Sequence, residues 1–343
     1  MLTSSLLLLA SLGTGLAQAQ LTLDDLYLNN APSSPRPYVI PHYANSHAVT
    51  IDSQLYRFTV TGPSSGYAFT LMSTNAPSSG SLGVLPHIHR KHYENFFSFK
   101  GRFQLWAQKG DNEQQAQILD PDTEMVGVIV PGGFDVTGTF SMPSAQTIPL
   151  EQTLRTFLNQ PIAPPRPAQE LPQSLLDFNP RRDLINGTAP VGDSDWHTAA
   201  NDLGTPGQPY FIANGYGPKY LNSQHGYQIV QPLVSPKLAQ DTNYTLSTLT
   251  ISRQTKDNPP QWNLAGAAAV EVLEGVLSIK IGDYPVAQLN MGDVAFIPAH
   301  VSFTYYCEAA FTKVLYVRSG TKGVDQQLIC GGMSWDFVTF PKY

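Results

Sequence analysis

The feature that most constrains this chain is a run of potential metal ligands at residues 86–94, which reads PHIHRKHYE and is followed by a glycine at position 101. In a β-strand, side chains two positions apart point to the same face, so His87 and His89 converge on one point. Glu94 lies five positions after His89, which is the wrong parity for one unbroken strand. A turn through the charged residues 90–92 must therefore separate two strands. The spacing predicts that two imidazoles and one carboxylate bind a single transition metal.

A pair of solvated histidines on a surface strand is the alternative interpretation of this run. The apolar residues 82–86 precede the pair, and the strand-like residues 103–106 follow the glycine. This sequence context favours a metal site formed by His87, His89 and Glu94. His92 is then a bystander that does not bind the metal. The ligand types suit copper, iron, manganese, nickel or zinc, so the run by itself does not select one metal.

Composition indicates a protein that is mostly β. The chain has 343 residues, which is enough for two ordinary domains. Only 13% of the residues are charged, and 27 glycines and 28 prolines separate runs rich in Val, Phe, Tyr and Thr. The net charge of −6 and the lack of a basic patch argue against a nucleic-acid partner. Beyond the N-terminus, no stretch is long and apolar enough to span a membrane.

The N-terminus predicts secretion. Residues 6–10 form an apolar core, and Ala17-Gln18-Ala19 is a small-x-small cleavage signal, so we expect a signal peptide over residues 1–19. Two glycosylation sequons, at Asn186 and Asn243, agree with an extracellular location.

Two cysteines, Cys307 and Cys330, are the only ones in the chain. They either form a disulfide, which an oxidising compartment would permit, or remain as two free thiols. Neither belongs to a cluster that resembles a metal site.

The strand signals divide the chain into two halves. Residues 159–167 contain four prolines and exclude regular helix or central strand. We therefore predict an N-terminal domain over residues 20–140, a linker over 141–204 and a C-terminal domain over 205–343. The halves form a weak internal repeat, in which the strand after Gly101 resembles the strand after Gly275.

One segment breaks this repeat. The second half contains a Gly-rich stretch, residues 292–303, that has no counterpart in the first half. There the chain passes directly from Leu119 to Asp120.

The spacing HxH-x4-E-x6-G is identified as the first motif of the cupin family. The second cupin motif, a Gly-rich turn that leads through a proline to a histidine, resembles only residues 292–303. Pro298 is in place there, but His300 stands at a glycine position and Phe303 at the position of the metal histidine. The resemblance implies an all-β bicupin, with two jelly-roll β-barrels in tandem joined by a Pro-rich linker. It implies a metal in the N-terminal barrel only, and an N-terminal barrel that is incomplete at motif 2.

Over most of the mature chain, the sequence is similar to the secreted fungal quercetin 2,3-dioxygenases, which are copper bicupins. The similarity is weak only over residues 135–185, and the matching stretches are residues 36–40, 55–77, 83–108, 120–134, 211–227 and the C-terminal barrel. The resemblance implies a dioxygenase that cleaves the heterocyclic ring of a flavonol with dioxygen and releases carbon monoxide.

The resemblance also implies roles for individual residues. His87, His89 and Glu94 match metal ligands, and Glu94 also matches the base that accepts the proton of the flavonol 3-hydroxyl. Copper is the implied metal, with iron or another divalent metal as the alternative. Six further positions match the lining of the substrate cavity: Tyr56, Met72, Thr74, Phe96, Met125 and Ile129.

The lost segment removes the third histidine ligand of the family. Without this segment, the N-terminal barrel has an opened wall with exposed strand edges. An exposed edge can pair with a second copy of the chain, so a homodimer is one expected arrangement. A water molecule, His42 or His47 is a candidate for the fourth ligand position.

Several interpretations follow from this gap. The chain is a dioxygenase with rearranged ligation, a catalytically impaired bicupin that only binds a phenolic or sugar ligand, or the translation of a mis-spliced gene. Another cupin enzyme, such as a metal-dependent isomerase or an oxalate-type decarboxylase, is disfavoured because the aromatic and Met-rich lining does not suit a small anion.

Overall fold

The fold is described from a computed structural model. The described residues are 20–41, 48–51, 54–75, 87–88, 95–98, 103–109, 113–119, 139–140, 179–180, 198–205, 210–238, 244–254, 257, 259–320 and 322–342. Several predictions fall outside these ranges: the signal peptide, most of the linker, both sequon asparagines (Asn186 and Asn243), and the site candidates His42, His47, His89, Glu94, Met125 and Ile129.

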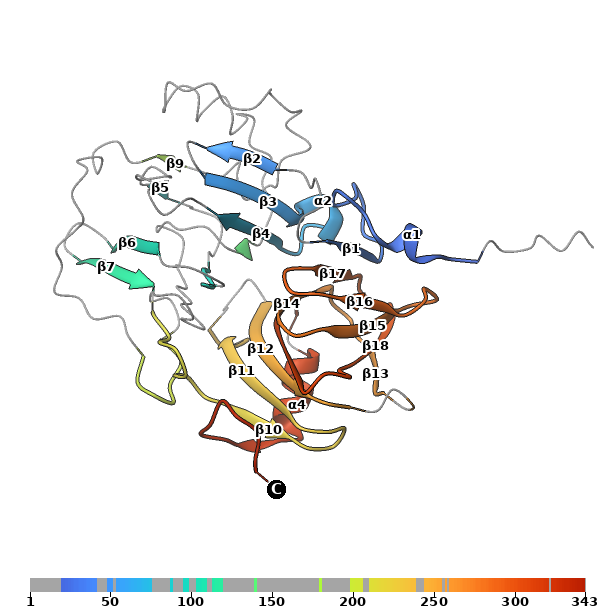
Figure 1. The fold of residues 1–343 in the computed structure, drawn as a ribbon. Coiled ribbons are helices and arrows are strands. Elements are labelled where there is room, and N and C mark those ends of the chain that lie inside the picture. Colours follow the sequence, from blue (N-terminus) through green and yellow to red (C-terminus); the bar gives the residue numbers. More distant parts are fainter. Residues whose placement is uncertain are drawn as a thin grey trace, which may run out of the picture.

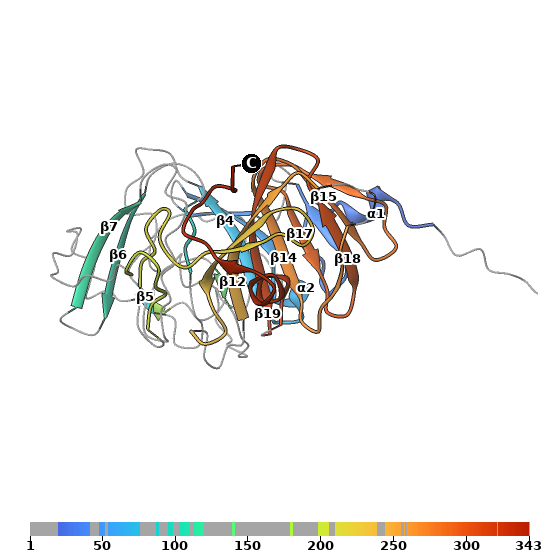
Figure 2. The same ribbon diagram turned by 90° about the horizontal axis from the view of Figure 1, so that it is seen from below.

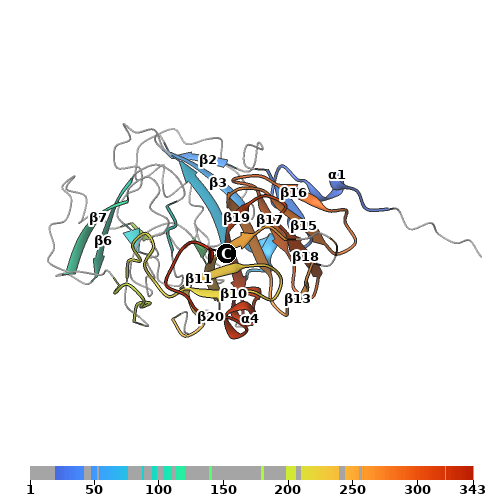
Figure 3. The ribbon, with the colours of Figure 1, turned by 60° about the horizontal axis from the view of Figure 1, so that its bottom comes forward.

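An eight-stranded antiparallel sheet is the centre of the molecule (Figure 1). In spatial order its strands are β1 (Tyr38–Ile40), β17 (Val294–Ile297), β14 (Ala268–Glu274), β19 (Phe311–Ser319), β12 (Tyr244–Ser252), β11 (Gln228–Val234), β10 (Tyr220–Asn222) and β20 (Met333–Ser334). A second sheet of four strands completes the C-terminal barrel: β13 (Gln261–Asn263), β18 (Ser302–Tyr306), β15 (Leu277–Ile281) and β16 (Ala287–Leu289). Helix α4 (Val324–Cys330) packs on the β10–β11 end of the barrel (Figure 3).

The central strands of the eight-stranded sheet are buried on both faces, and strand β14 shows why. Ala268, Val270 and Val272 belong to the cluster inside the C-terminal barrel. Ala269 and Leu273 belong to a second cluster on the opposite face. Because side chains alternate between faces, an almost continuous apolar run is what such a strand requires.

The second cluster joins the two halves of the chain, and we call it the inter-barrel cluster. Val60, Phe69 and Leu71 contribute from the first half, and Phe296 and Leu315 are among the residues that contribute from the eight-stranded sheet. The first-half residues lie on or beside strands β3 (Gln54–Val60) and β4 (Thr70–Asn75), with helix α2 (Gly62–Ser65) between them. Figure 1 shows these elements above β17 and β14.

The remaining described strands all belong to the first half or the predicted linker. Strands β2 (Ala48–Ile51), β3, β4 and β8 (Thr139–Phe140) form a four-stranded sheet. Strand β5 (His87–Ile88) pairs with β9 (Asn179–Pro180), which comes from the predicted linker range, and β6 (Phe103–Lys109) pairs with β7 (Glu113–Leu119). Figure 2 shows the β6–β7 hairpin at the end of the molecule away from α1 (Leu23–Leu26). The antiparallel sheets and short helices confirm the predicted all-β bicupin class.

The N-terminal arm belongs to the C-terminal barrel, although its sequence position lies within the range predicted for the N-terminal domain. Strand β1 pairs with β17, with Val39 opposite Ala295. Leu26 of α1 and Val39 are fully buried in the core of the C-terminal barrel. Tyr38 stacks on Phe296 with the ring centroids 5.2 Å apart, on the other face of the sheet. The arm therefore contributes to both clusters.

Both cysteines are free thiols in this fold. Cys307 is buried, with its sulfur 3.0 Å from the Thr312 hydroxyl, whereas Cys330 is exposed at the end of α4. None of the described helices is long and apolar enough to cross a membrane.

We predict that Leu26→Ala lowers the free energy of unfolding by about 2–5 kcal/mol, because it leaves a cavity in the core of the C-terminal barrel. The control is Leu23→Ala on the same helix, where the side chain is 37% exposed; it changes the stability by less than about 0.5 kcal/mol. Urea unfolding followed by tryptophan fluorescence measures both. Equal effects of the two variants would show that the arm is not part of the core.

Candidate metal centre

The structure places the beginning of the predicted metal-binding run in an extended conformation. His87 is the first residue of β5 and lies opposite Pro180 of β9. This backbone conformation is what the shared-face argument for His87 and His89 requires at its first position. His89 and Glu94 are outside the described residues, so the triad stays a prediction. Within the described residues, no group of three or more His, Cys, Asp or Glu side chains gathers as a metal site.

Three of the predicted pocket positions lie together on the β3–β4 ladder. Tyr56 of β3 is directly opposite Thr74 of β4, and the next pair on the same face is Phe58 with Met72. Because directly opposed residues and residues two apart share a face, Tyr56, Met72 and Thr74 occupy one side of this sheet. Met72 is buried.

The fourth described pocket residue, Phe96, is buried in the segment of residues 95–98, which comes from elsewhere in the first half. The last two predicted pocket residues, Met125 and Ile129, are not among the described residues.

The opposite side of β4 contacts the C-terminal barrel through a buried carboxyl group. Leu71 packs in the inter-barrel cluster, and Ser73 hydrogen-bonds to Glu271 of β14. Burial raises the pKa of Glu271 to about 7, and the hydrogen bond from Ser73 partly opposes that increase. The strand that carries the predicted pocket positions Met72 and Thr74 is thus attached by its reverse face to the second barrel. The sequence signal for this contact was a single glutamate inside the apolar run of β14.

The segment that follows Glu94 also rests on the C-terminal barrel. Asn95 and Ser98 are buried polar residues. The side-chain amide of Asn95 donates a hydrogen bond to the hydroxyl oxygen of Tyr244, the first residue of β12. Phe97 packs against the inter-barrel cluster. Sequence reasoning did not identify Asn95 or Tyr244, because no local pattern connects them.

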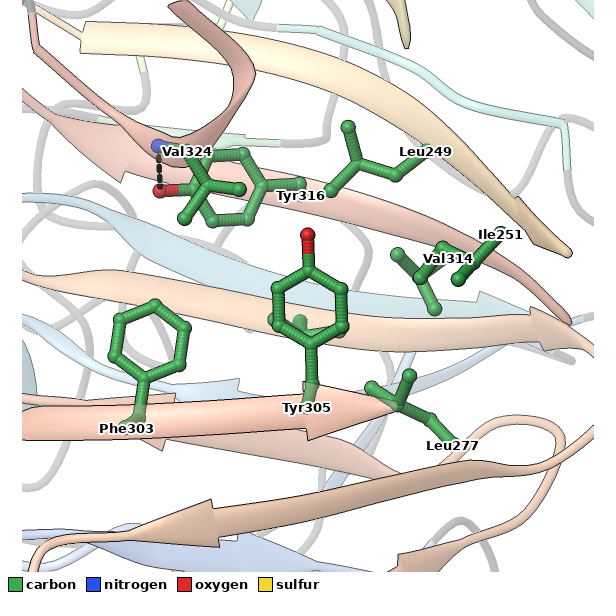
Figure 4. Close-up of a pocket in the computed structure, with 9 residues that line it drawn as sticks. Leu249, Ile251, Leu277, Phe303, Tyr305, Val314, Tyr316 and Val324 are labelled. Carbon is green, nitrogen blue, oxygen red and sulfur yellow. Dashed lines mark hydrogen bonds between the residues drawn. The ribbon is translucent and has the colours of Figure 1, made fainter. Parts of the chain in front are cut away.

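The interior of the C-terminal barrel is filled by its own side chains. Phe303, at the position of the metal histidine, is buried in this interior (Figure 4). Tyr305 points from the same strand toward Tyr316, and its hydroxyl donates to Gln228 at 2.7 Å. The remaining cavity is about the size of one water molecule, and it is lined by Leu249, Ile251, Val270, Leu277, Phe303, Tyr305, Val314, Tyr316 and Val324. This barrel has no room for an organic substrate at that place.

The turn before Phe303 contains a residue in the left-handed conformation. His300, which stands at a glycine position of the motif, adopts a left-handed backbone with φ of 64°. Few residues other than glycine adopt this conformation, which explains the family preference for glycine there.

Comparison with known proteins gives one strong similarity. The chain is 51% identical over 354 aligned residues to a quercetin 2,3-dioxygenase of Aspergillus japonicus, and the alignment covers 92% of this chain and 98% of the relative. An alignment of 354 positions is longer than the 343 residues of this chain, so it includes residues of the relative that have no counterpart here. No protein-family model matches the chain.

Solved structures show weaker likenesses. An 11S allergen of Cocos nucifera has a TM-score of 0.49 at 10% identity, and the match covers 84% of this chain and 90% of the allergen. An oxalate decarboxylase of Lactobacillus farciminis has a TM-score of 0.48 at 10% identity, with coverage of 86% and 89%. At these values, neither likeness says anything about activity.

We predict that Glu271→Gln stabilises the protein at pH 8 by about 3 kcal/mol and has little effect at pH 4.5. The raised pKa means that the folded state holds the proton more tightly than the unfolded state. Wild-type stability therefore falls as the pH rises from the ordinary value of 4.5 through about 7, and glutamine avoids this loss.

The control for this prediction is Glu274→Gln, which changes an exposed carboxylate at the end of the same strand. We expect it to alter stability by less than about 0.5 kcal/mol at either pH. Thermal and urea unfolding of the three proteins at both pH values measure the difference. A Glu271→Gln variant that is no more stable than wild type at pH 8 would contradict the assigned burial.

Proposed function

Because this chain belongs to the quercetin 2,3-dioxygenase family, we propose that it is a secreted, copper-dependent oxygenase that opens the heterocyclic ring of flavonols such as quercetin and releases carbon monoxide. The observation that carries the proposal is the β3–β4 ladder, in which the predicted pocket position Tyr56 lies opposite Thr74 and on the same face as Met72. Tyr56 is on a different strand from Met72 and Thr74, so the placement of the three predicted positions on one face supports a common cavity.

The predicted donor set fits a copper ion. His87, His89 and Glu94 would hold it with two imidazole nitrogens and one carboxylate, a set that iron or another divalent metal also accepts. The metal supplies the one-electron chemistry that makes a flavonol reactive toward dioxygen.

The protein's own residues would prepare the substrate. We propose that Glu94 accepts the proton of the 3-hydroxyl, which leaves a flavonolate as the electron-rich reactant. The face that carries Tyr56, Met72 and Thr74, together with Phe96, would orient the flat ring system and exclude water. Met125 and Ile129 are proposed to complete the lining.

The proposed location is extracellular. Its support is the predicted signal peptide over residues 1–19 and the predicted glycosylation at Asn186 and Asn243. The proposed partners are therefore a flavonol and dioxygen, with no nucleic acid and no membrane, and a homodimer through the opened barrel wall is a further proposal.

A second candidate function is supported by the length of the alignment with the Aspergillus relative, which requires gaps in this chain. If one gap lies between Leu119 and Asp120, the third histidine ligand is absent. The chain is then a ligand-binding bicupin with little or no activity, or the product of a mis-spliced transcript. Two experiments distinguish these functions.

We predict that the mature chain, loaded with copper, consumes quercetin and releases carbon monoxide in air but not under anaerobic conditions. His87→Ala removes one imidazole ligand, so we expect at least a tenfold loss of bound copper and of activity. His92→Ala, a bystander in the same run, serves as the control and keeps both. Metal analysis, flavonol absorbance and carbon monoxide detection measure the outcome. Quercetin binding without turnover, in a protein that purifies with little metal, would establish the second function instead.

We predict that insertion of the corresponding segment of the Aspergillus relative between Leu119 and Asp120 raises kcat at least a hundredfold if the second function is correct. The matched control carries the same insertion with its motif histidine replaced by alanine, which restores the barrel wall but not the ligand. Sequencing of the transcript shows whether the gene already encodes the segment. An insertion that leaves kcat unchanged would mean that the three predicted ligands are sufficient.

A further inference from the structure

One hydrogen bond connects the second barrel to the residue that directly follows Glu94. The side-chain amide of Asn95 donates to the Tyr244 hydroxyl oxygen across 149 residues of sequence. Tyr244 is 2% exposed and Asn95 is 3% exposed, so water does not compete for either group. A hydrogen bond buried in this way is strongly directional and is costly to lose.

Tyr244 is held in a rigid part of the molecule. It begins β12, a central strand of the eight-stranded sheet, and pairs with Ser319 of β19. Its ring lies in the inter-barrel cluster. The position of its hydroxyl is therefore set by the pairing of β12 with β19 and by packing in the inter-barrel cluster.

Among the described residues, Tyr244 is the side-chain hydrogen-bond partner of Asn95. The side-chain oxygen of Asn95 has no hydrogen-bond partner among the described residues. Two positions further on, Phe97 packs on the inter-barrel cluster. One hydrogen bond to the second barrel and one apolar contact with the inter-barrel cluster thus help to locate the segment 95–98, and Glu94 is covalently attached to its first residue.

We propose that Tyr244 is a positioning residue for the active site, supplied by the barrel that the metal does not occupy. By holding Asn95, it would restrain the chain directly next to Glu94, the proposed base and metal ligand. The proposal rests on the proposed function only for the role of Glu94. The C-terminal barrel would then contribute to the reaction although its own interior is filled. The two barrels would not function when they are separated.

The test compares Tyr244→Phe with Tyr210→Phe in the full mature chain. Tyr210 is a matched control, because it is a buried tyrosine of the same cluster whose hydroxyl donates to the main-chain oxygen of Leu233 in the second barrel. Both variants remove one buried hydroxyl, but only Tyr244→Phe removes a hydrogen bond to the segment 95–98. Three readouts are taken: amide hydrogen exchange of a peptide that contains residues 95–98, the Cu(II) electron paramagnetic resonance spectrum, and kcat and KM for quercetin.

For Tyr244→Phe, we expect exchange in residues 95–98 to become about tenfold faster. We also expect an altered Cu(II) spectrum and a kcat about tenfold lower with KM changed less than threefold, because the pocket face is intact while the carboxylate is displaced. The Tyr210→Phe variant should match wild type in all three readouts.

The proposal is overturned if Tyr244→Phe exchanges like wild type over residues 95–98, or if both tyrosine variants behave alike. Hydrogen exchange needs neither metal nor turnover, so it decides whether Tyr244 holds the segment 95–98 even if an inactive wild-type chain refutes the proposed function. Should Tyr244→Phe fold poorly, Asn95→Leu removes the other partner of the same bond without touching the barrel, and the same readouts apply. An Asn95→Leu variant with wild-type exchange, spectrum and kcat would also refute the positioning role.

Discussion

The structure depends on a single eight-stranded sheet whose central strands are buried on both faces. One face encloses the interior of the C-terminal barrel, and the other supports the elements of the first half. Each large apolar side chain that is buried in this way contributes roughly 1.5–3 kcal/mol. The sheet therefore serves as the core of one barrel and as the platform for the other, and a change on either face affects both.

Hydrogen bonds across the inter-barrel cluster add directional contacts to this apolar packing. Tyr38 contacts the hydroxyl of Ser64, Glu271 accepts from Ser73, and Tyr244 accepts from Asn95. Each pair joins an element that belongs to the eight-stranded sheet with an element of the first half. Apolar contacts tolerate sliding, whereas buried hydrogen bonds are satisfied at one relative position only. We attribute the register between the two halves to these pairs.

The proposed function assigns different roles to the two halves of the chain. In the C-terminal barrel, Phe303 fills the position of a histidine, and the interior is packed with aromatic and aliphatic side chains. A closely packed interior makes the barrel rigid and leaves no space in it for a ligand. The proposed chemistry then falls to the first half, where the predicted ligands follow an apolar run, while the second half supplies the fixed points at Glu271 and Tyr244.

The sequence by itself determined the local features of this protein. The i, i+2 spacing of His87 and His89, the alternation in the strands and the phenylalanine at position 303 are properties of short segments, and they suffice for an all-β bicupin and a proposed metal run. Tertiary structure decided which distant segments meet. It placed β1 in the C-terminal sheet and brought Asn95 to Tyr244, 149 residues away. Local periodicity indicates that a side chain is buried but not against which partner, because that choice depends on the packing of the whole chain.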